Sequence, residues 1–204
     1  MPSPLRNGED DLHGNAPDSC RVALLLVDVL NDLDFPDNEE LVRQSAGLGE
    51  RIAALKQRCK ENGIPVIYVN DNHGRWRSNF IDVLNHSLRL ESLGRGMVSK
   101  LIPAAEDYVV LKPKHSAFFA TPLDALLEHM GVKVLILAGV TTNACVLITA
   151  ADVYVRDYKL FVPENCVAAL NPPDQDNALE LMRKNFGADT RPSGQIDLAT
   201  LCQL

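Results

Sequence analysis

The segment "ILAGVTTNACVLITAADVY", from Ile136 to Tyr154, joins an apolar run to a helical pattern through a short polar turn. The apolar run continues from the residues before it and ends near Gly139, as a buried strand does. Beyond the turn, apolar residues recur at helical spacing. Cys145 stands where the strand passes into the helix. The segment therefore predicts a strand–turn–helix unit with a thiol at the N-terminus of the helix.

Similar apolar runs predict the rest of a sheet. They are rich in Val, Ile and Leu and do not alternate with polar residues, which is typical of strands buried on both faces of a parallel sheet. Together with the run already described, they span 22–30, 64–70, 108–112, 132–140 and 159–163.

The segments between these runs carry helical patterns. Apolar periodicity and stop signals predict helices over 48–59, 121–131, 143–157 and 176–186. Strands that alternate with helices predict an α/β protein, with a three-layer, Rossmann-like α/β/α fold and an open parallel sheet of about six strands. Region 71–104 does not follow this alternation and is long enough for an active-site excursion.

The chain length and composition indicate a single globular domain. Its 204 residues are enough for one generous domain, which we expect over 21–204, after a flexible polar arm at 1–20 that lacks the apolar core of a secretory signal. The net charge of -7 argues against nucleic-acid and membrane-surface partners. Five cysteines without a C-x-x-C pair are typical of a reducing compartment. We therefore expect a cytoplasmic protein that acts on a small molecule.

Reactive side chains follow several of the predicted strands. Ligands of open parallel sheets bind beyond the carboxyl ends of the strands. Asp28 ends the first predicted strand, Asn70 the second and Lys112 the third, and Cys145 follows the fourth. The fold alone therefore predicts that a carboxylate, an amine and a thiol meet at one edge.

These three groups are chemically complementary. A thiol reacts as thiolate, which a helix N-terminus and the ammonium of Lys112 both favour. Asp28 is a suitable base for the thiol proton and a suitable acid for a leaving amine. Amides of the turn before Cys145 are candidate donors to an oxyanion. Taken singly, each residue also has an ordinary interpretation: a small buried hydrophobe for the cysteine, a loop carboxylate for Asp28 and a solvated lysine for Lys112.

Three blocks of sequence carry a family resemblance. "LLLVDVLNDL", "VLKPKHSAFFATPLDALL" and "LILAGVTTNACVLITAADVYVRDYKLFVPENCVA" resemble the signature blocks of the isochorismatase-like cysteine hydrolases. That family includes nicotinamidases, N-carbamoylsarcosine amidohydrolases and ureidoacrylate-type amidohydrolases. The resemblance covers residues 20–190 and implies an acid/base at Asp28, a lysine at Lys112 and a nucleophile at Cys145. Lys114 lies close to Lys112, but the spacing to "SAF" favours Lys112.

The resemblance also implies details of the turn and of assembly. It places a cis peptide at Val140–Thr141, with the amides of Thr141 and Cys145 as oxyanion donors. It suggests a homo-oligomer, either a dimer or a tetramer.

The chain departs from the family at two places. The first block commonly reads "D-x-Q-N-D-F", but here Leu30 and Leu33 replace the glutamine and the phenylalanine, so the resemblance does not carry over the aromatic that packs against the pyridine ring in nicotinamidases. Nicotinamidases also bind a metal through an Asp-x-His pair and further histidines. Asp71 and His73 have that spacing, but the next histidine, His86, is distant in sequence. Because zinc usually has at least three protein ligands, we expect no metal and no cofactor.

Several residues are candidates for the pocket wall. Trp76, beside Arg75 in the irregular region, is either an aromatic wall with an arginine for a substrate carboxylate or a surface anchor. His115 and Phe118, close to Lys112 in the chain, are further candidates to line the pocket, as is Asn70.

Together these features predict a cysteine hydrolase that cleaves a C–N bond of a small amide or ureido compound. Cys145 attacks the carbonyl, a thioester forms as an amine leaves, and water activated by Asp28 releases the acid. The alternatives are an isochorismatase-type vinyl-ether hydrolase, and a non-catalytic binding or scaffold protein of the same fold. A phosphate or dinucleotide binder is disfavoured because the first turn, "DVLNDLD", has no glycine to cradle phosphate.

Overall fold

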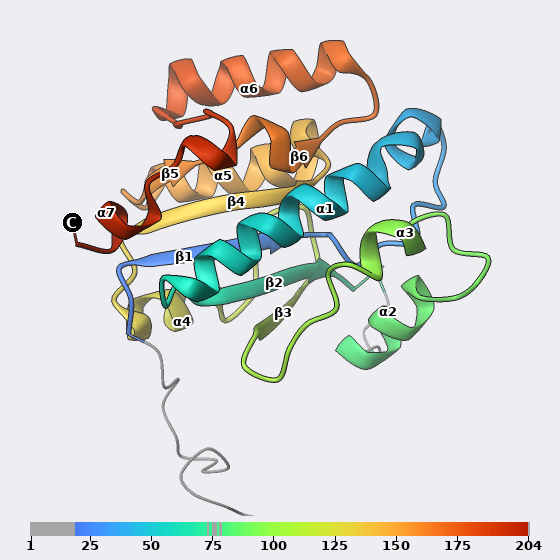
Figure 1. The fold of residues 1–204 in the computed structure, drawn as a ribbon, viewed down its shortest axis with the longest axis horizontal. Coiled ribbons are helices and arrows are strands. Elements are labelled where there is room, and N and C mark those ends of the chain that lie inside the picture. The colour runs from blue at the N-terminus through green and yellow to red at the C-terminus, as the bar shows by residue number, and fades with distance from the viewer. Residues whose placement is uncertain (1–18, 73, 75–76, 78, 204) are drawn as a thin grey trace, which may run out of the picture.

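The protein is described by a computed structural model that covers residues 19–72, 74, 77 and 79–203. Its centre is a six-stranded sheet whose strands run in the order β3-β2-β1-β4-β5, with β6 paired to the end of β4 (Figure 1). Every pairing between these strands is parallel, which confirms the predicted open parallel sheet. The strands are β1 (Val22–Val27), β2 (Val66–Asp71), β3 (Tyr108–Lys112), β4 (Val134–Val140), β5 (Lys159–Phe161) and β6 (Val167–Ala168).

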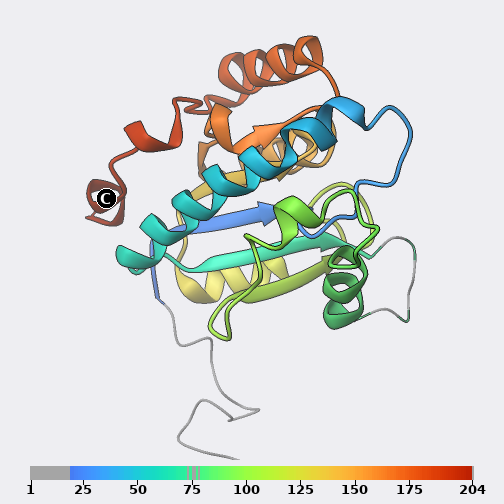
Figure 2. The same cartoon turned by 45° about the vertical axis from the view of Figure 1, so that its right-hand side comes forward.

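Helices cover both faces of the sheet, as the views from two directions show (Figures 1 and 2). One core contains side chains of α1 (Glu39–Glu61), α2 (Phe80–Ser87), α3 (Arg95–Val98) and α7 (Leu198–Gln203). The other contains side chains of α4 (Leu123–Met130), α5 (Leu147–Val155) and α6 (Pro172–Phe186). The three-layer architecture expected from the sequence is therefore confirmed. Within the described residues, no helix combines the length and the apolar character needed to cross a bilayer.

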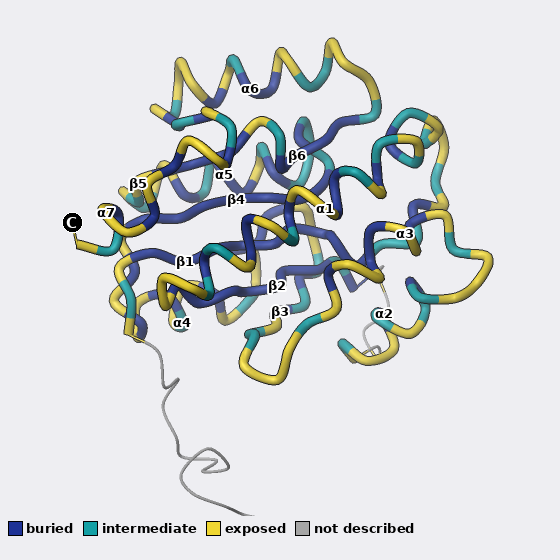
Figure 3. Tube along the Cα trace, in the orientation of Figure 1, coloured by how far each residue is buried: buried dark blue, intermediate teal, exposed yellow. Residues whose placement is uncertain are grey.

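The continuous apolar runs follow from this double cover. Along β1, Leu24 and Leu26 pack into one core, whereas Leu25 and Val27 pack into the other. All six residues of β1 are buried, and the tube of the central strands is dark blue in Figure 3. Successive side chains of such a strand enter two different apolar cores, so no position is left for a solvated polar residue. The sequence is therefore apolar throughout instead of alternating between apolar and polar residues.

Two helices begin earlier in the chain than the sequence predicted, and the segment after β4 begins differently. Helix α1 begins at Glu39, well before the predicted start, and its buried Leu41 and Ser45 continue the apolar face. Helix α6 begins at Pro172, because the side chain of Asn171 accepts a hydrogen bond from the backbone N–H of Asp174 and caps the helix. The segment after β4 starts as a π-helical turn, η1 (Thr142–Val146), before α5.

Gly139 is required by the close approach of β4 to β1. It pairs with Val27 in the parallel register and has a φ of 129°, which side chains rarely adopt. A Cβ atom at this position would lie 1.9 Å from the carbonyl oxygen of Val27. Strand β4, which leads to Cys145, can therefore pair with β1 in this register only with glycine at position 139.

Replacing Gly139 with alanine should destabilise the protein strongly. We expect Gly139→Ala to lower the free energy of unfolding by about 3 kcal/mol or more, because both the backbone conformation and the contact with Val27 are unfavourable. The matched control is Gly131→Ala, which also has a positive φ but nothing within 4 Å of the added Cβ. That control should lose only about 1 kcal/mol. Equal losses for the two variants in urea unfolding would contradict this account of the β1–β4 approach.

Candidate active site

The carboxylate of Asp28 lies at the carboxyl end of β1 and is nearly enclosed. Its backbone adopts a φ of 51°, a left-handed conformation that aspartate tolerates better than most residues. Its Oδ1 accepts a hydrogen bond from the backbone N–H of Asp71 at 2.7 Å, and its Oδ2 lies 2.9 Å from Nζ of Lys112. Only 6% of the side chain is exposed. Asp28 is therefore fixed in both position and charge partner.

The ammonium of Lys112 is at the centre of the site and has no solvent exposure. Besides Asp28, it lies 3.6 Å from Oδ2 of Asp71 and 3.5 Å from Sγ of Cys145, and it donates to the carbonyl oxygen of Lys114 at 3.1 Å. Burial opposes the charge of Lys112, but its interactions with Asp28, Cys145 and Asp71 outweigh burial and raise the pKa of Lys112. The lysine therefore stays an ammonium in the interior.

Cys145 lies in η1, and it is only partly exposed. Its Sγ contacts Nζ of Lys112 and also lies 3.5 Å from Nδ1 of His115. The predicted meeting of Asp28, Lys112 and Cys145 at one sheet edge is confirmed in space, while their catalytic roles stay predictions. The segment joins a strand to a helical turn, so the sulfur is presented at the junction of the two.

The surroundings of Cys145 act on its ionisation in opposite directions. Burial, followed by the charge and hydrogen bond of Asp28, raises the pKa of the Cys145 thiol to about 12, although Lys112 lowers it. One ammonium already compensates two carboxylates, Asp28 and Asp71, and a thiolate would add a third negative charge. The balance favours the thiol at rest, and the sequence-predicted role of Asp28 as the base for its proton stays a prediction.

A pocket of about 340 Å³ opens above this group. Asp28, Asp71, His115 and Cys145 line it from the strand ends, and the loop after β1 closes one side with Asp32, Asp34 and Phe35. The sequence analysis did not single out these three loop residues. The available signal was the polar run "NDLDFPD" directly after a buried strand.

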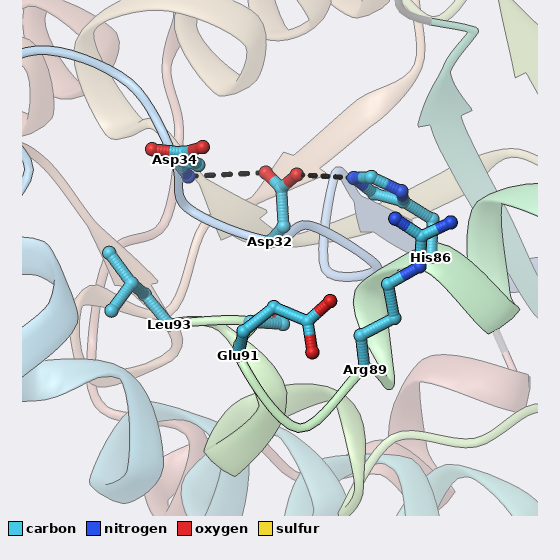
Figure 4. A pocket seen from close by; sticks show the side chains of 7 residues that line it. Asp32, Asp34, His86, Arg89, Glu91 and Leu93 are labelled. Carbon is cyan, nitrogen blue, oxygen red and sulfur yellow. Dashed lines mark hydrogen bonds and ion pairs between the residues drawn. The ribbon is translucent and has the colours of Figure 1, made fainter.

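A second pocket, of about 440 Å³, adjoins the first and shares Asp32 and Asp34 with it. Figure 4 shows Asp32 between Asp34 and His86, with its Oδ2 2.7 Å from Nε2 of His86. Its Oδ1 accepts the backbone N–H of Asp34 at 3.1 Å. Asp32 therefore stands in the wall that separates the two pockets and is held there from both sides.

The turn between β4 and η1 contains the predicted cis peptide. The bond between Val140 and Thr141 is cis, and both residues line the first pocket. The carbonyl oxygen of Thr141 accepts hydrogen bonds from the backbone N–H groups of Ala144 and Val146 at 3.1 and 3.2 Å. The turn is thus ordered beside the sulfur, and the proposed oxyanion donors, the amides of Thr141 and Cys145, stay a prediction.

Two residues predicted to bind substrate have other tasks. Asn70 is fully buried, and its side-chain amide bonds to the backbone N–H and C=O of Leu30 at 3.3 and 2.7 Å, so it holds the loop after β1. Phe118 is buried in the core, where its ring stacks on Tyr158 and lies 4.4 Å from the guanidinium of Arg156. Neither lines the pocket, and both predictions are corrected. Arg75, Trp76 and His73 lie outside the described residues.

Of the Asp71 and His73 pair, only Asp71 lies among the described residues. Its carboxylate lies beside the ammonium of Lys112. Among the described residues, no three His, Cys, Asp or Glu side chains are placed to hold one ion.

Comparison with known proteins identifies relatives along most of the chain. The isochorismatase domain family matches residues 22–191. An uncharacterized isochorismatase family protein of Bacillus subtilis (strain 168) is 34% identical over 174 residues, which are 85% of this chain and 95% of that protein. A probable inactive nicotinamidase of Arabidopsis thaliana is 28% identical over 177 residues, 82% of this chain and 90% of its own.

Among solved structures, N-carbamoylsarcosine amidase from Thermoplasma acidophilum has a similar fold. The TM-score is 0.66 at 28% sequence identity, and the match covers 87% of this chain and 99% of the amidase. The relatives thus include a protein described as an amidase and one described as inactive, so the family alone does not decide the activity.

Substitutions of Asp28 and Lys112 should move the pKa of Cys145 in opposite directions. Asp28→Asn removes the charge that raises this pKa, and Lys112→Met removes the one that lowers it. At a fixed pH near 8, alkylation of Cys145 by iodoacetamide should speed up in Asp28→Asn and slow down in Lys112→Met, each by about tenfold per unit of pKa change.

The matched control for this experiment is Lys114→Met, which removes an exposed neighbouring ammonium and should leave the rate unchanged. The rate at Cys145 is read by peptide mass spectrometry, so the other cysteines do not interfere. Shifts in the same direction, or none in either variant, would mean that the three groups do not share one electrostatic site.

Proposed function

The chain belongs to the isochorismatase family, and we propose that it is a cysteine-dependent hydrolase that cleaves a C–N bond of a small amide or ureido compound. One observation carries the proposal: a partly exposed thiol that lines the pocket contacts a buried ammonium, which is paired with an enclosed carboxylate. This arrangement supplies a nucleophile, a proton carrier and a fixed counter-charge in one place. The likeness to an amidase supports the same reaction class.

The first half of the proposed reaction forms a thioester. As Sγ of Cys145 attacks the carbonyl carbon of the substrate, its proton passes to Asp28, with which it is hydrogen-bonded. The C–N bond then breaks, and Asp28 returns the proton to the departing ammonia or amine. Lys112 keeps a positive charge beside both groups throughout the reaction. The amides of Thr141 and Cys145 are proposed to stabilise the oxyanion.

The second half hydrolyses the thioester. Water adds to the acyl carbon, the C–S bond breaks, and the product leaves as a carboxylic acid while Cys145 regains its proton. The pocket volume of about 340 Å³ suits a small substrate, which matches the proposed amide or ureido class.

A panel of substrates tests this proposal against its rivals. We expect turnover of at least one small primary amide or ureido acid, and a loss of at least about 10³-fold in Cys145→Ala, because the nucleophile is gone. Cys202→Ala, which removes another partly exposed thiol, is the matched control and should retain full activity. Ammonia release measures the reaction.

Two results would contradict the proposal in different ways. Hydrolysis of isochorismate that survives in Cys145→Ala would favour a vinyl-ether hydrolase that does not use the thiol. Binding of panel members without turnover of any would favour a non-catalytic member of the family.

We also propose that the chain forms a homo-oligomer. Helix α5 and the segment before α4 expose Ile148, Val155 and Phe119, of which Val155 is 68% exposed. Covering such apolar side chains favours association. Light scattering at micromolar concentration should give a mass of at least two chains, and a mass of 22.4 kDa would contradict the proposal.

A further inference from the structure

His115 is a polar neighbour of Cys145 and has no role in the reaction proposed above. Nδ1 of His115 lies 3.5 Å from Sγ, the same distance as Nζ of Lys112. His115 follows β3 three residues after Lys112, lines the pocket and is exposed. The sulfur is therefore flanked by two different environments, a buried ion pair on one side and an accessible imidazole on the other.

Asp28 lines the pocket but is engaged by two partners. It keeps Oδ1 on the backbone N–H of Asp71 and Oδ2 on the ammonium of Lys112, with 6% of its side chain exposed. His115 also lines the pocket, and it is exposed to the water that must reach the acyl carbon. The imidazole is therefore the more accessible base for this water.

We propose that His115 is a second catalytic residue, the base that activates water for hydrolysis of the thioester on Cys145. This proposal rests on the proposed function and replaces the expectation that Asp28 activates the water. Asp28 then serves the formation of the thioester, and His115 serves its hydrolysis. Both proton carriers neighbour the same sulfur.

In the proposed step, one nitrogen of His115 accepts a proton and later returns it. Nδ1 of His115 takes a proton from water as the oxygen bonds to the acyl carbon. The tetrahedral intermediate collapses, the C–S bond breaks, and the acid leaves. The proton then passes from Nδ1 to Sγ over the 3.5 Å that separate them and restores the thiol. A neutral imidazole suits this role, because the nitrogen that accepts a proton donates the same proton afterwards.

The two halves can be measured separately with p-nitrophenyl acetate, an activated ester that acylates thiols. With enzyme in excess, release of p-nitrophenol gives the rate of thioester formation. The loss of the acetyl group from Cys145, followed by acid quench and intact mass, gives the rate of its hydrolysis. The variants are His115→Gln, which keeps a hydrogen-bonding amide but cannot carry a proton, and His129→Gln, a matched change of an exposed histidine on α4.

We expect His115→Gln to slow loss of the acetyl group by at least about 10²-fold, while thioester formation stays nearly unchanged. Acetylated Cys145 should accumulate, and added imidazole should restore part of the lost rate, which a merely structural role of His115 would not allow. His129→Gln should behave like the unaltered protein. Because His115 is exposed, its substitution should not affect folding, and circular dichroism checks this.

Three results would overturn the proposal or its basis. Unchanged loss of the acetyl group in His115→Gln would exclude His115 as the base. Equal slowing of both halves, without recovery in imidazole, would make it a positioning residue. Release of p-nitrophenol that persists in Cys145→Ala would instead remove the thioester, and with it the proposed function itself.

Discussion

The site depends on one buried ammonium, that of Lys112. A charge with no solvent exposure is stable only where partners replace its water, and Asp28, Asp71 and the carbonyl oxygen of Lys114 do so. These partners come from the ends of β1 and β2 and from the segment after β3, the strand that carries Lys112 itself. The parallel register sets Asp71 directly opposite Lys112, and the backbone N–H of Asp28 bonds to Val69. A shift in the register of any one of these strands would leave the ammonium of Lys112 without one of these partners. The sheet register therefore determines the geometry of the site.

The same charge balance explains the state of the thiol. Burial and the charge of Asp28 raise the pKa of the Cys145 thiol, and the ammonium of Lys112, which also neighbours Asp28 and Asp71, offsets this only in part. In the proposed reaction the sulfur therefore starts as a thiol and becomes the nucleophile as Asp28 takes its proton.

The sequence predicted this arrangement wherever the pattern was strong. Continuous apolar runs indicated the parallel sheet, and the sheet in turn placed Asp28, Lys112 and Cys145 at one edge, where the structure has them. The sequence did not predict the task of Asn70, because nothing local shows that its amide would bond to the backbone of Leu30, forty residues away. The pKa of Cys145 could not be predicted for a related reason. Residue types name a cation and an anion, whereas the direction of the pKa shift depends on burial first and then on the distances of Asp28 and Lys112 from the sulfur, which appear only in space.

The most direct test of this account is the ionisation of Cys145 itself. Cysteine labelled with ¹³C at Cβ reports thiol and thiolate by its chemical shift, and the spectrum of Cys145→Ser assigns the signal. The account predicts that the Cys145 signal keeps its thiol position beyond the pH of about 8.5 at which a free cysteine titrates. A midpoint at or below neutral pH would contradict it, because Lys112 would then be stabilising a preformed thiolate rather than balancing two carboxylates.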